Sequence, residues 1–189
     1  MSLPTRVTSI LGYWFGATFA TSPVENFGLW YGGAQETDDH IRATYGEWLV
    51  EAEDGKLNQW IEQGPYDALA LIVLLDQFGL NAYRDLSRGY EASAKAAPLT
   101  YEAIRRGYDK VLPKPMVSFL YMPLMHSEKL DDQEECARLF EALHGAPDEF
   151  ATEHRDIIKK YGRFPGRNKV HARENTEAEL EYLKNGGVF

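Results

Sequence analysis

The sequence predicts an all-α fold built from antiparallel helix pairs, and three observations support this prediction. Apolar residues recur at spacings of three and four along most of the 189 residues. Glycine and proline interrupt this pattern at short joints such as Gly64-Pro65 and Pro113-Lys114-Pro115. No segment of useful length alternates apolar and polar residues as a β-strand would. We expect a single helical domain over residues 1–189, since a chain of this length can bury a sizeable core.

The elements of the first third follow from local signals. Arg6–Phe15 is expected to form an apolar helix that Gly16 ends. A long connection rich in glycine and aromatic residues follows over 17–35. Asp38 and Asp39 then favour a helix start, because carboxylates stabilise a helix N-terminus. Gly55 ends that helix, and a short one is expected over Leu57–Gln63.

The next helix is expected to run from Tyr66 to Phe78, after a proline that suits a first helical turn. It is apolar on all sides from Ala68 to Leu75, which is typical of a central, buried element. Gly79 is a candidate for its end. Pro98 and several glycines separate the remaining helices. These are expected at Ser87–Ala97, Tyr101–Val111, Met116–Ser127, Asp131–Leu143, Pro147–Tyr161 and Thr176–Lys184.

Composition excludes several classes of protein. The hydrophobic fraction of 44% argues against disorder, and the net charge of −9 argues against general nucleic-acid binding, which needs basic surface. The longest apolar run, Ala68–Leu75, is too short to span a membrane. Met1-Ser2-Leu3-Pro4 begins no signal segment and Cys136 is the only cysteine, so we expect a cytoplasmic protein without disulfides. No metal-ligand spacing or nucleotide-binding motif occurs, so no metal or cofactor is predicted.

Three polar clusters interrupt the apolar pattern. Buried polar groups cost free energy unless they are paired, so the clusters either pair with one another or converge on a site. Seven Lys or Arg residues against a single acid between Arg155 and Arg173 suggest attraction of an anion, or of acidic segments elsewhere. The candidate site residues are Asp76, Gln77, Asn81, Arg84, His126, Glu128, His154, Arg163, Arg167 and Asn168.

The first two clusters follow apolar helical runs. If the helix continues past Gly79, Gln77, Asn81 and Arg84 extend its core-facing stripe at helical spacing. His126 shares a stripe with apolar residues and titrates near neutral pH, so it is the candidate for proton transfer, although such a histidine is more often a core residue. Glu128 is expected to interact with the start of the following helix.

The third cluster surrounds the end of a helix. His154 lies on an apolar stripe of that helix, and Gly162 ends it. Arg163 and Arg167 follow in a proline-containing loop, and each guanidinium presents a planar fork suited to carboxylate or phosphate. The two side chains would form a clamp for a small anionic ligand. Alternatively, they bind Asp76, Glu128 or free helix carbonyls and so hold the C-terminal segment in place.

These motifs also carry a resemblance. They are Ile10–Gly16, Leu74–Phe78, Asn81, Tyr83-Arg84, Phe119–Leu124, His126-Ser127-Glu128, Gln133, His154, Gly162–Pro165 and Arg167-Asn168. Together they resemble the bacterial domain-of-unknown-function family 924 over nearly the whole chain. The resemblance implies an all-helical fold akin to the tetratricopeptide-like superfamily, and it implies no activity.

The chain departs from the family pattern at three places. Gly79-Leu80 stands where Pro-Arg is usual, and Gly166 stands where a histidine is usual. His171-Ala172 replaces Leu-Gly before Arg173. One arginine and one histidine of the family's polar set are therefore absent.

Three functions fit these observations. The first is binding of a small anionic metabolite in an interior polar cleft, with acid–base chemistry at His126 and with enzyme activity left open. The second is a helical scaffold for a peptide or protein partner, favoured by the fold resemblance and by tryptophans such as Trp30 and Trp48. The third is an internal structural network without a ligand. Neither a nucleic-acid partner nor a membrane partner is expected.

Overall fold

The computed structural model describes residues 5–189, and these residues form helices and connections without any strand. The prediction of an all-α fold is therefore confirmed. The expectation about a signal segment concerns residues 1–4, which lie outside the described part. The chain forms two compact units. Unit 1 contains the chain up to Arg84 together with Arg88–Pro123, and unit 2 contains Asp85–Ser87 together with Leu124–Phe189.

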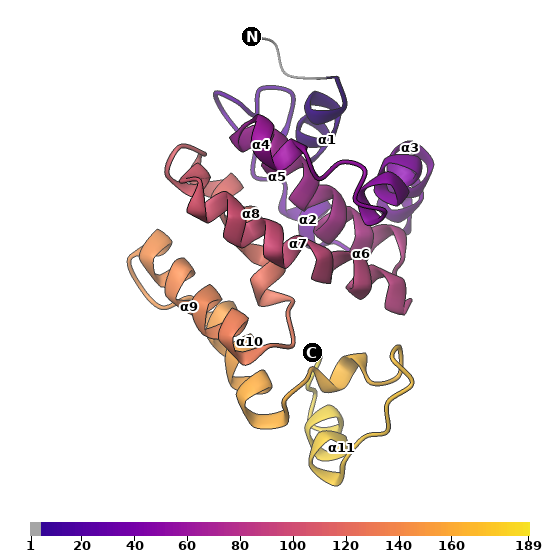
Figure 1. The fold of residues 1–189 in the computed structure, drawn as a ribbon. Coiled ribbons are helices and arrows are strands. Elements are labelled where there is room, and N and C mark those ends of the chain that lie inside the picture. The colour runs from indigo at the N-terminus through magenta and orange to yellow at the C-terminus, as the bar shows by residue number, and fades with distance from the viewer. Residues whose placement is uncertain (1–4) are drawn as a thin grey trace. The chain divides into compact units, whose positions relative to one another are not determined.

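The first helices of unit 1 include one that the sequence did not predict. The helices are α1 (Thr5–Phe15), α2 (Phe27–Tyr31), α3 (Gln35–Glu53) and α4 (Trp60–Gln63) (Figure 1). The short α2 lies inside the expected connection, and the Asn26 side chain caps it by accepting a hydrogen bond from the Leu29 N–H. The Trp30 indole N–H donates to the Trp14 carbonyl at 2.9 Å, which attaches α2 to α1.

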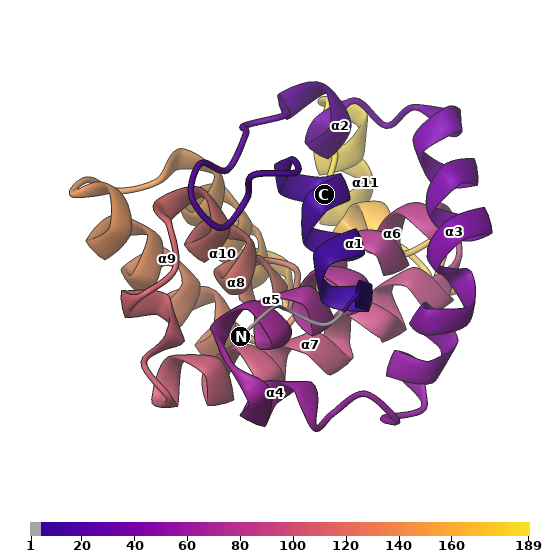
Figure 2. The same cartoon turned by 90° about the horizontal axis from the view of Figure 1, so that it is seen from above.

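The central helix of unit 1 is longer than expected and changes its winding. It begins as α5 (Pro65–Val73), continues as a π-helix (Leu74–Phe78) and ends as α6 (Gly79–Ala82). Gly79 keeps a helical φ of −58°, so the expectation that it ends the helix is wrong. Both α1 and α3 pack on this helix (Figure 2). Every residue from Asp67 to Phe78 is buried, as its apolar sequence predicts.

Gly79 instead allows α6 to pack closely against the helix that contains Gly89 and Ala92. A Cβ added at Gly79 would lie 3.0 Å from Ala92 Cβ, and one added at Gly89 would lie 3.2 Å from the Gly79 carbonyl oxygen. The two glycines thus let α6 and the next helix approach closely. This contact gives a physical reason for a glycine at the place where the family pattern has another residue.

The next helix, α7 (Ser87–Arg105), corrects a second expectation, because Pro98 does not separate two helices. Pro98 lies inside one continuous helix, where it gives up one backbone hydrogen bond. Alanines at four of the six positions 92–97 are strong helix formers and sustain the helix. A short 3-10 helix (Tyr108–Lys110) follows, and then α8 (Lys114–Met125), whose last two residues belong to unit 2.

Unit 2 contains an antiparallel helix pair and a C-terminal segment. The pair is α9 (Leu130–His144) and α10 (Glu149–Tyr161), joined by a short loop (Figure 1). A 3-10 helix (Pro165–Arg167) and α11 (Glu177–Lys184) follow. Ile157, Ile158 and Phe164 form the core of this region, and rings from α11 and the chain end pack against them. None of the helices in residues 5–189 has the length and apolar character needed to cross a membrane.

Candidate functional site

The ten candidate residues divide between the two units. Asp76, Gln77, Asn81 and Arg84 belong to unit 1. The other six, which come from the second and third clusters, belong to unit 2. Each group is held together by contacts within its own unit.

Asp76 and Gln77 lie on the π-helix, a rare form that is frequent at functional sites. Asp76 is fully buried, and its carboxylate accepts hydrogen bonds from the Ser93 hydroxyl and from the Gln77 amide. The same Gln77 amide lies 3.4 Å from the Met122 sulfur. The π-helix thus directs both side chains into the interior, where they join three helices of unit 1.

Asn81 and Arg84 continue this chain of contacts at helical spacing. Asn81 Nδ2 donates to the Gln77 carbonyl at 2.7 Å, and Arg84 Nη2 donates to Asn81 Oδ1 at 2.8 Å. Arg84 also binds both carboxylate oxygens of Asp38, which is 1% exposed. Asp38 was predicted only as a helix-start residue, and its pair with Arg84 was not predicted. The signal was present, since Asp38 precedes Ile41 and Tyr45 on the buried stripe of α3.

Side chains from α9 form hydrogen bonds with the end of α8 and with the segment that follows it. The Gln133 amide donates to the carbonyls of Leu124, Met125 and Ser127 at 3.3, 2.6 and 2.6 Å. Gln133 thereby satisfies carbonyls that a helix end leaves without partners. The Ser127 hydroxyl donates to Asp132 at 2.6 Å. This hydroxyl therefore takes part in the start of α9.

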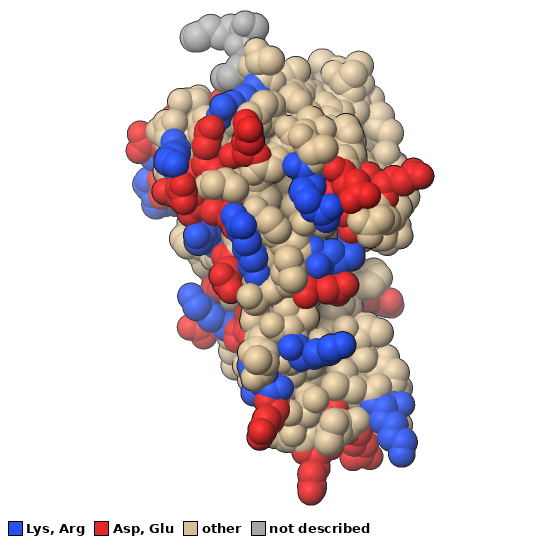
Figure 3. Space-filling model, turned by 90° about the vertical axis from the view of Figure 1, so that its right-hand side faces the viewer, with Lys and Arg blue, Asp and Glu red and all other residues tan. Residues whose placement is uncertain are grey.

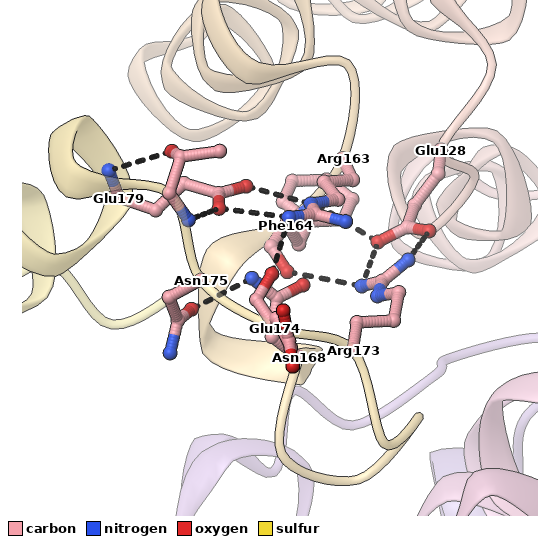
Figure 4. Close-up of polar contacts among 9 residues, drawn as sticks. Glu128, Arg163, Phe164, Asn168, Arg173, Glu174, Asn175 and Glu179 are labelled. Atoms are coloured by element: carbon pink, nitrogen blue, oxygen red, sulfur yellow. Dashed lines mark hydrogen bonds and ion pairs between the residues drawn. The ribbon is translucent and has the colours of Figure 1, made fainter.

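Glu128 binds the C-terminal segment and not the start of α9, so that expectation is wrong. Its carboxylate accepts the Phe164 N–H at 2.8 Å and pairs with Arg173 at 2.6 and 2.9 Å (Figure 4). Burial by itself raises the pKa of Glu128, but the hydrogen bonds from Arg173 and Phe164 outweigh it and leave the pKa below its usual value. Arg173 was not among the predicted site residues, because sequence spacing does not indicate its partner.

Arg163 and Arg167 have different partners. Arg163 binds both oxygens of Glu179 at 2.6 and 2.8 Å, together with the Glu174 carbonyl (Figure 4). The hydrogen bond from Arg163 is the main reason that the pKa of Glu179 falls to about 2. Glu179 also accepts the Thr176 N–H, which closes the capping box of α11. The role of Arg163 in this geometry is to attach α11 to the loop that follows α10.

Arg167 lies against the second cluster. Its Nη1 donates to the His126 carbonyl at 2.7 Å, and its guanidinium lies 4.2 Å above the Phe164 ring. A guanidinium over an aromatic face is a favourable cation–π arrangement. This contact agrees with the alternative in which Arg167 binds a free carbonyl at a helix end, here that of His126 after α8.

His154 is the buried histidine of the cluster. Its Nδ1 lies 2.7 Å from the Phe150 carbonyl, so the neutral ring carries its proton on Nδ1 and leaves a lone pair on Nε2. Phe164 and Phe189 pack against the ring at 5.5 and 4.0 Å between centroids. Burial, with smaller effects of the nearby His126 and Arg167, lowers the pKa of His154 to about 4 against the opposing effect of the Phe150 carbonyl.

Asn168 is fully buried, and its Nδ2 donates to Asn175 at 2.7 Å (Figure 4). Its carbonyl oxygen accepts the Arg173 N–H at 2.8 Å. Within residues 5–189, Asn168 Oδ1 and Arg173 Nε are buried without hydrogen-bond partners. Asn168 therefore shapes the loop that presents Arg167 and Arg173.

Two departures from the family pattern have structural consequences here. A Cβ at Gly166 would lie 2.8 Å from the Val188 carbonyl oxygen and 2.9 Å from the Phe189 carbonyl carbon, and the Gly166 N–H donates to Phe189 O at 2.7 Å. The chain end thus occupies the space of a side chain at position 166. Ala172 has a φ of +51°, a left-handed conformation suited to the glycine that is usual there.

Other kinds of site find less support. In the described part of the chain, no three His, Cys, Asp or Glu side chains are gathered as they would be to hold a metal ion. Burial raises the pKa of the Cys136 thiol, whereas reactive cysteines have a lowered pKa. Figure 3 shows acidic and basic side chains interspersed over one face of the molecule, without a broad basic patch.

Comparisons with known proteins agree with the helical fold. A solved structure of a protein of unknown function from Agrobacterium tumefaciens is similar to this chain, with 31% sequence identity and a TM-score of 0.83. The similarity covers 95% of this chain and 97% of that one. A search of curated proteins gave no match. The model of a family described as bacterial protein of unknown function (DUF924) matches residues 10–187. The chain therefore belongs to the DUF924 family.

Proposed function

We propose that unit 2 binds a small anionic ligand beside Arg167, His126 and His154. The observation that carries the proposal is the position of the Arg167 guanidinium, held between the His126 carbonyl and the Phe164 ring next to the buried His154. The Arg167 guanidinium and the His154 imidazole both lie against the Phe164 ring, and an anion beside them would contact more than one nitrogen-bearing group. His154 Nε2 makes no hydrogen bond among residues 5–189, so it would accept one from a ligand hydroxyl or from a protonated phosphate.

The other members of the two clusters support this arrangement. Glu128 and Arg173 hold the backbone of Phe164, and Arg163 holds the same loop through Glu179. Within the proposal, Glu128, Arg163 and Asn168 are positioning residues that keep Arg167 in place. His126 is the candidate for proton transfer, because an imidazole can both accept and donate a proton.

The test is an NMR titration of the histidine side chains with inorganic phosphate as the probe. A bound anion stabilises the imidazolium, so phosphate should raise the pKa of His154 above about 4. Arg167→Gln should abolish this response. Lys169→Gln removes the same charge from an exposed position in the same segment and should retain it.

Two results would contradict the proposal. One is a pKa of His154 that does not change when phosphate is added to the wild-type protein. The other is an equal loss of response in both variants, which would indicate general charge attraction. Circular dichroism of Arg167→Gln checks that the helices persist, and Arg167→Lys should recover part of the response because it restores the charge without the planar fork.

A further inference from the structure

A second surface of unit 2 is lined by residues outside the anion proposal. A groove of about 470 Å³ runs between α10 and α11. Ile157, Tyr161 and Tyr182 supply its apolar lining, and the two tyrosine rings lie 5.3 Å apart between centroids. None of the residues that line the groove is a candidate residue of the anion site.

Acidic side chains border this apolar lining. Glu149, Glu153 and Asp156 follow one another at intervals of four and three residues, which places them on one face of α10. Asp156 pairs with Arg155 at 2.8 Å. Glu149 and Glu153 form no ion pair with any residue of the described chain, and both are exposed. Their charge is therefore available to a positively charged partner.

The aromatic end of the groove already holds one cation. The Lys160 ammonium lies 4.9 Å from the centre of the Tyr161 ring, which is within the range of a cation–π contact. Lys160 is exposed at the surface of α10. A partner lysine or arginine would contact the neighbouring carboxylates and compete with Lys160 for the Tyr161 ring.

An exposed apolar side chain extends the surface beyond the groove. Phe150 is 66% exposed and lies seven and eleven residues before Ile157 and Tyr161, hence on the same side of α10. An exposed large apolar group beside a groove is typical of a protein-interaction surface.

We propose that this groove docks a short segment of a partner protein that carries apolar side chains flanked by lysine or arginine. The apolar lining would take the apolar side chains, and Glu149 and Glu153 would pair with the basic ones. A second copy of this chain fits poorly, because it would bring a like-charged acidic border to the groove. A small polyamine would satisfy the carboxylates but leave the tyrosines and Ile157 without an apolar partner.

The probe is a fluorescein-labelled peptide of alternating lysine and leucine, and its binding is followed by fluorescence anisotropy. Two matched peptides replace every lysine by glutamate or every leucine by serine. We expect the lysine–leucine peptide to bind and both matched peptides to bind about tenfold more weakly or not at all. Rising salt should weaken binding, since charge pairs at an exposed border are screened.

Protein variants locate the binding. Glu153→Lys should weaken binding about tenfold, whereas Glu134→Lys, the same charge change at an exposed position of α9 outside the groove, should alter it less than about twofold. Arg167→Gln should leave peptide binding unchanged, which separates this proposal from the anion site. Hydrogen exchange should slow along α10 and α11 when the peptide is bound.

Several outcomes would overturn the proposal. Equal weakening by Glu153→Lys and Glu134→Lys would mean general attraction to a negative protein. Undiminished binding of the serine peptide, or displacement of the lysine–leucine peptide by spermidine at equal concentration, would mean a polycation site without apolar docking. Failure of the peptide to bind, or concentration-dependent dimerisation that Glu153→Lys abolishes, would also exclude a docked partner segment.

Discussion

Glu128 and Arg173 form a two-point ion pair, with nitrogen–oxygen distances of 2.6 and 2.9 Å, that joins the segment after α8 to the segment after α10. The same carboxylate accepts the Phe164 N–H. One acid thus holds two separate parts of the C-terminal segment. Arg163 pairs with Glu179 in the same way. Two arginines of the basic segment are therefore neutralised by acidic side chains of the same unit.

Glu128→Gln should destabilise the protein by about 1–3 kcal/mol, because it leaves the Arg173 guanidinium without its carboxylate in a half-buried place. Asp54→Asn breaks the exposed pair with Lys56 and should cost much less, because solvent screens an exposed ion pair. Urea denaturation at neutral pH measures both. Equal small losses would show that the Glu128 pair contributes no more than a surface pair.

The stability of the protein should depend on pH through His154. Its pKa in the folded protein is about 4, below the usual 6.5, so the unfolded chain binds a proton first as pH falls. The unfolding free energy should therefore rise from pH 4 to pH 6.5, by at most about 3 kcal/mol from this group. His154→Gln should flatten the rise, and His40→Gln, at an exposed histidine, should not. Identical pH profiles for the wild type and His154→Gln would contradict this account.

Glu179 should act in a lower pH range. Its folded pKa of about 2 lies below the ordinary 4.5, so its contribution is complete above pH 4.5 and is lost as pH falls toward 2. In acid unfolding followed by circular dichroism, Glu179→Gln should lose stability at neutral pH and show a smaller further loss between pH 4.5 and 2. An unchanged acid transition would exclude this carboxylate as a cause of acid sensitivity.

Ala172→Gly should stabilise the protein by about 1 kcal/mol, because glycine adopts a positive φ without the steric cost that alanine incurs. The same substitution at Ala142, an exposed helical position in α9, should destabilise by about 1 kcal/mol. Opposite signs in urea denaturation are the expected result. A loss of stability at position 172 would mean that the alanine methyl group makes a contact worth more than the strain.

Gly166→Ala should destabilise by about 1–2 kcal/mol or displace residues 187–189, since the new Cβ would meet backbone atoms of Val188 and Phe189. Gly12→Ala is the matched control. A Cβ at Gly12 in α1 would meet nothing within 4 Å, so alanine should stabilise through its helix propensity. Thermal unfolding ranks the two variants, and a stable Gly166→Ala protein with an unchanged chain end would refute the steric explanation.

Local signals in the sequence predicted most of the helices. Gly55, Gly145 and Gly162 lie at helix ends with positive φ, as expected from their freedom of backbone conformation. Pro98 and Gly79 misled the prediction, because surrounding alanines and close helix packing outweighed their usual tendency to end helices. Helix α2 was missed because five residues give too short a pattern to recognise.

Few of the contacts that the candidate residues make could be predicted from the sequence. His126 and Arg167 do meet in unit 2, as do Glu128 and the backbone of the Arg163 loop. The missed partners include Asp38, Ser93, Arg173 and Glu179. Each lies between 16 and 46 residues away from the residue that it binds, a separation at which helical periodicity carries no information.

The sequence by itself determined the all-α class, the order of the main helices and the membership of the polar clusters. These features depend on side-chain period, glycine and proline, which act within a few residues. Only the tertiary structure decided that Glu128 binds Arg173 and that Arg163 binds Glu179. The physical reason is that every arginine offers the same charge and the same fork, so its partner is selected by which carboxylate the folded backbone brings within hydrogen-bonding distance.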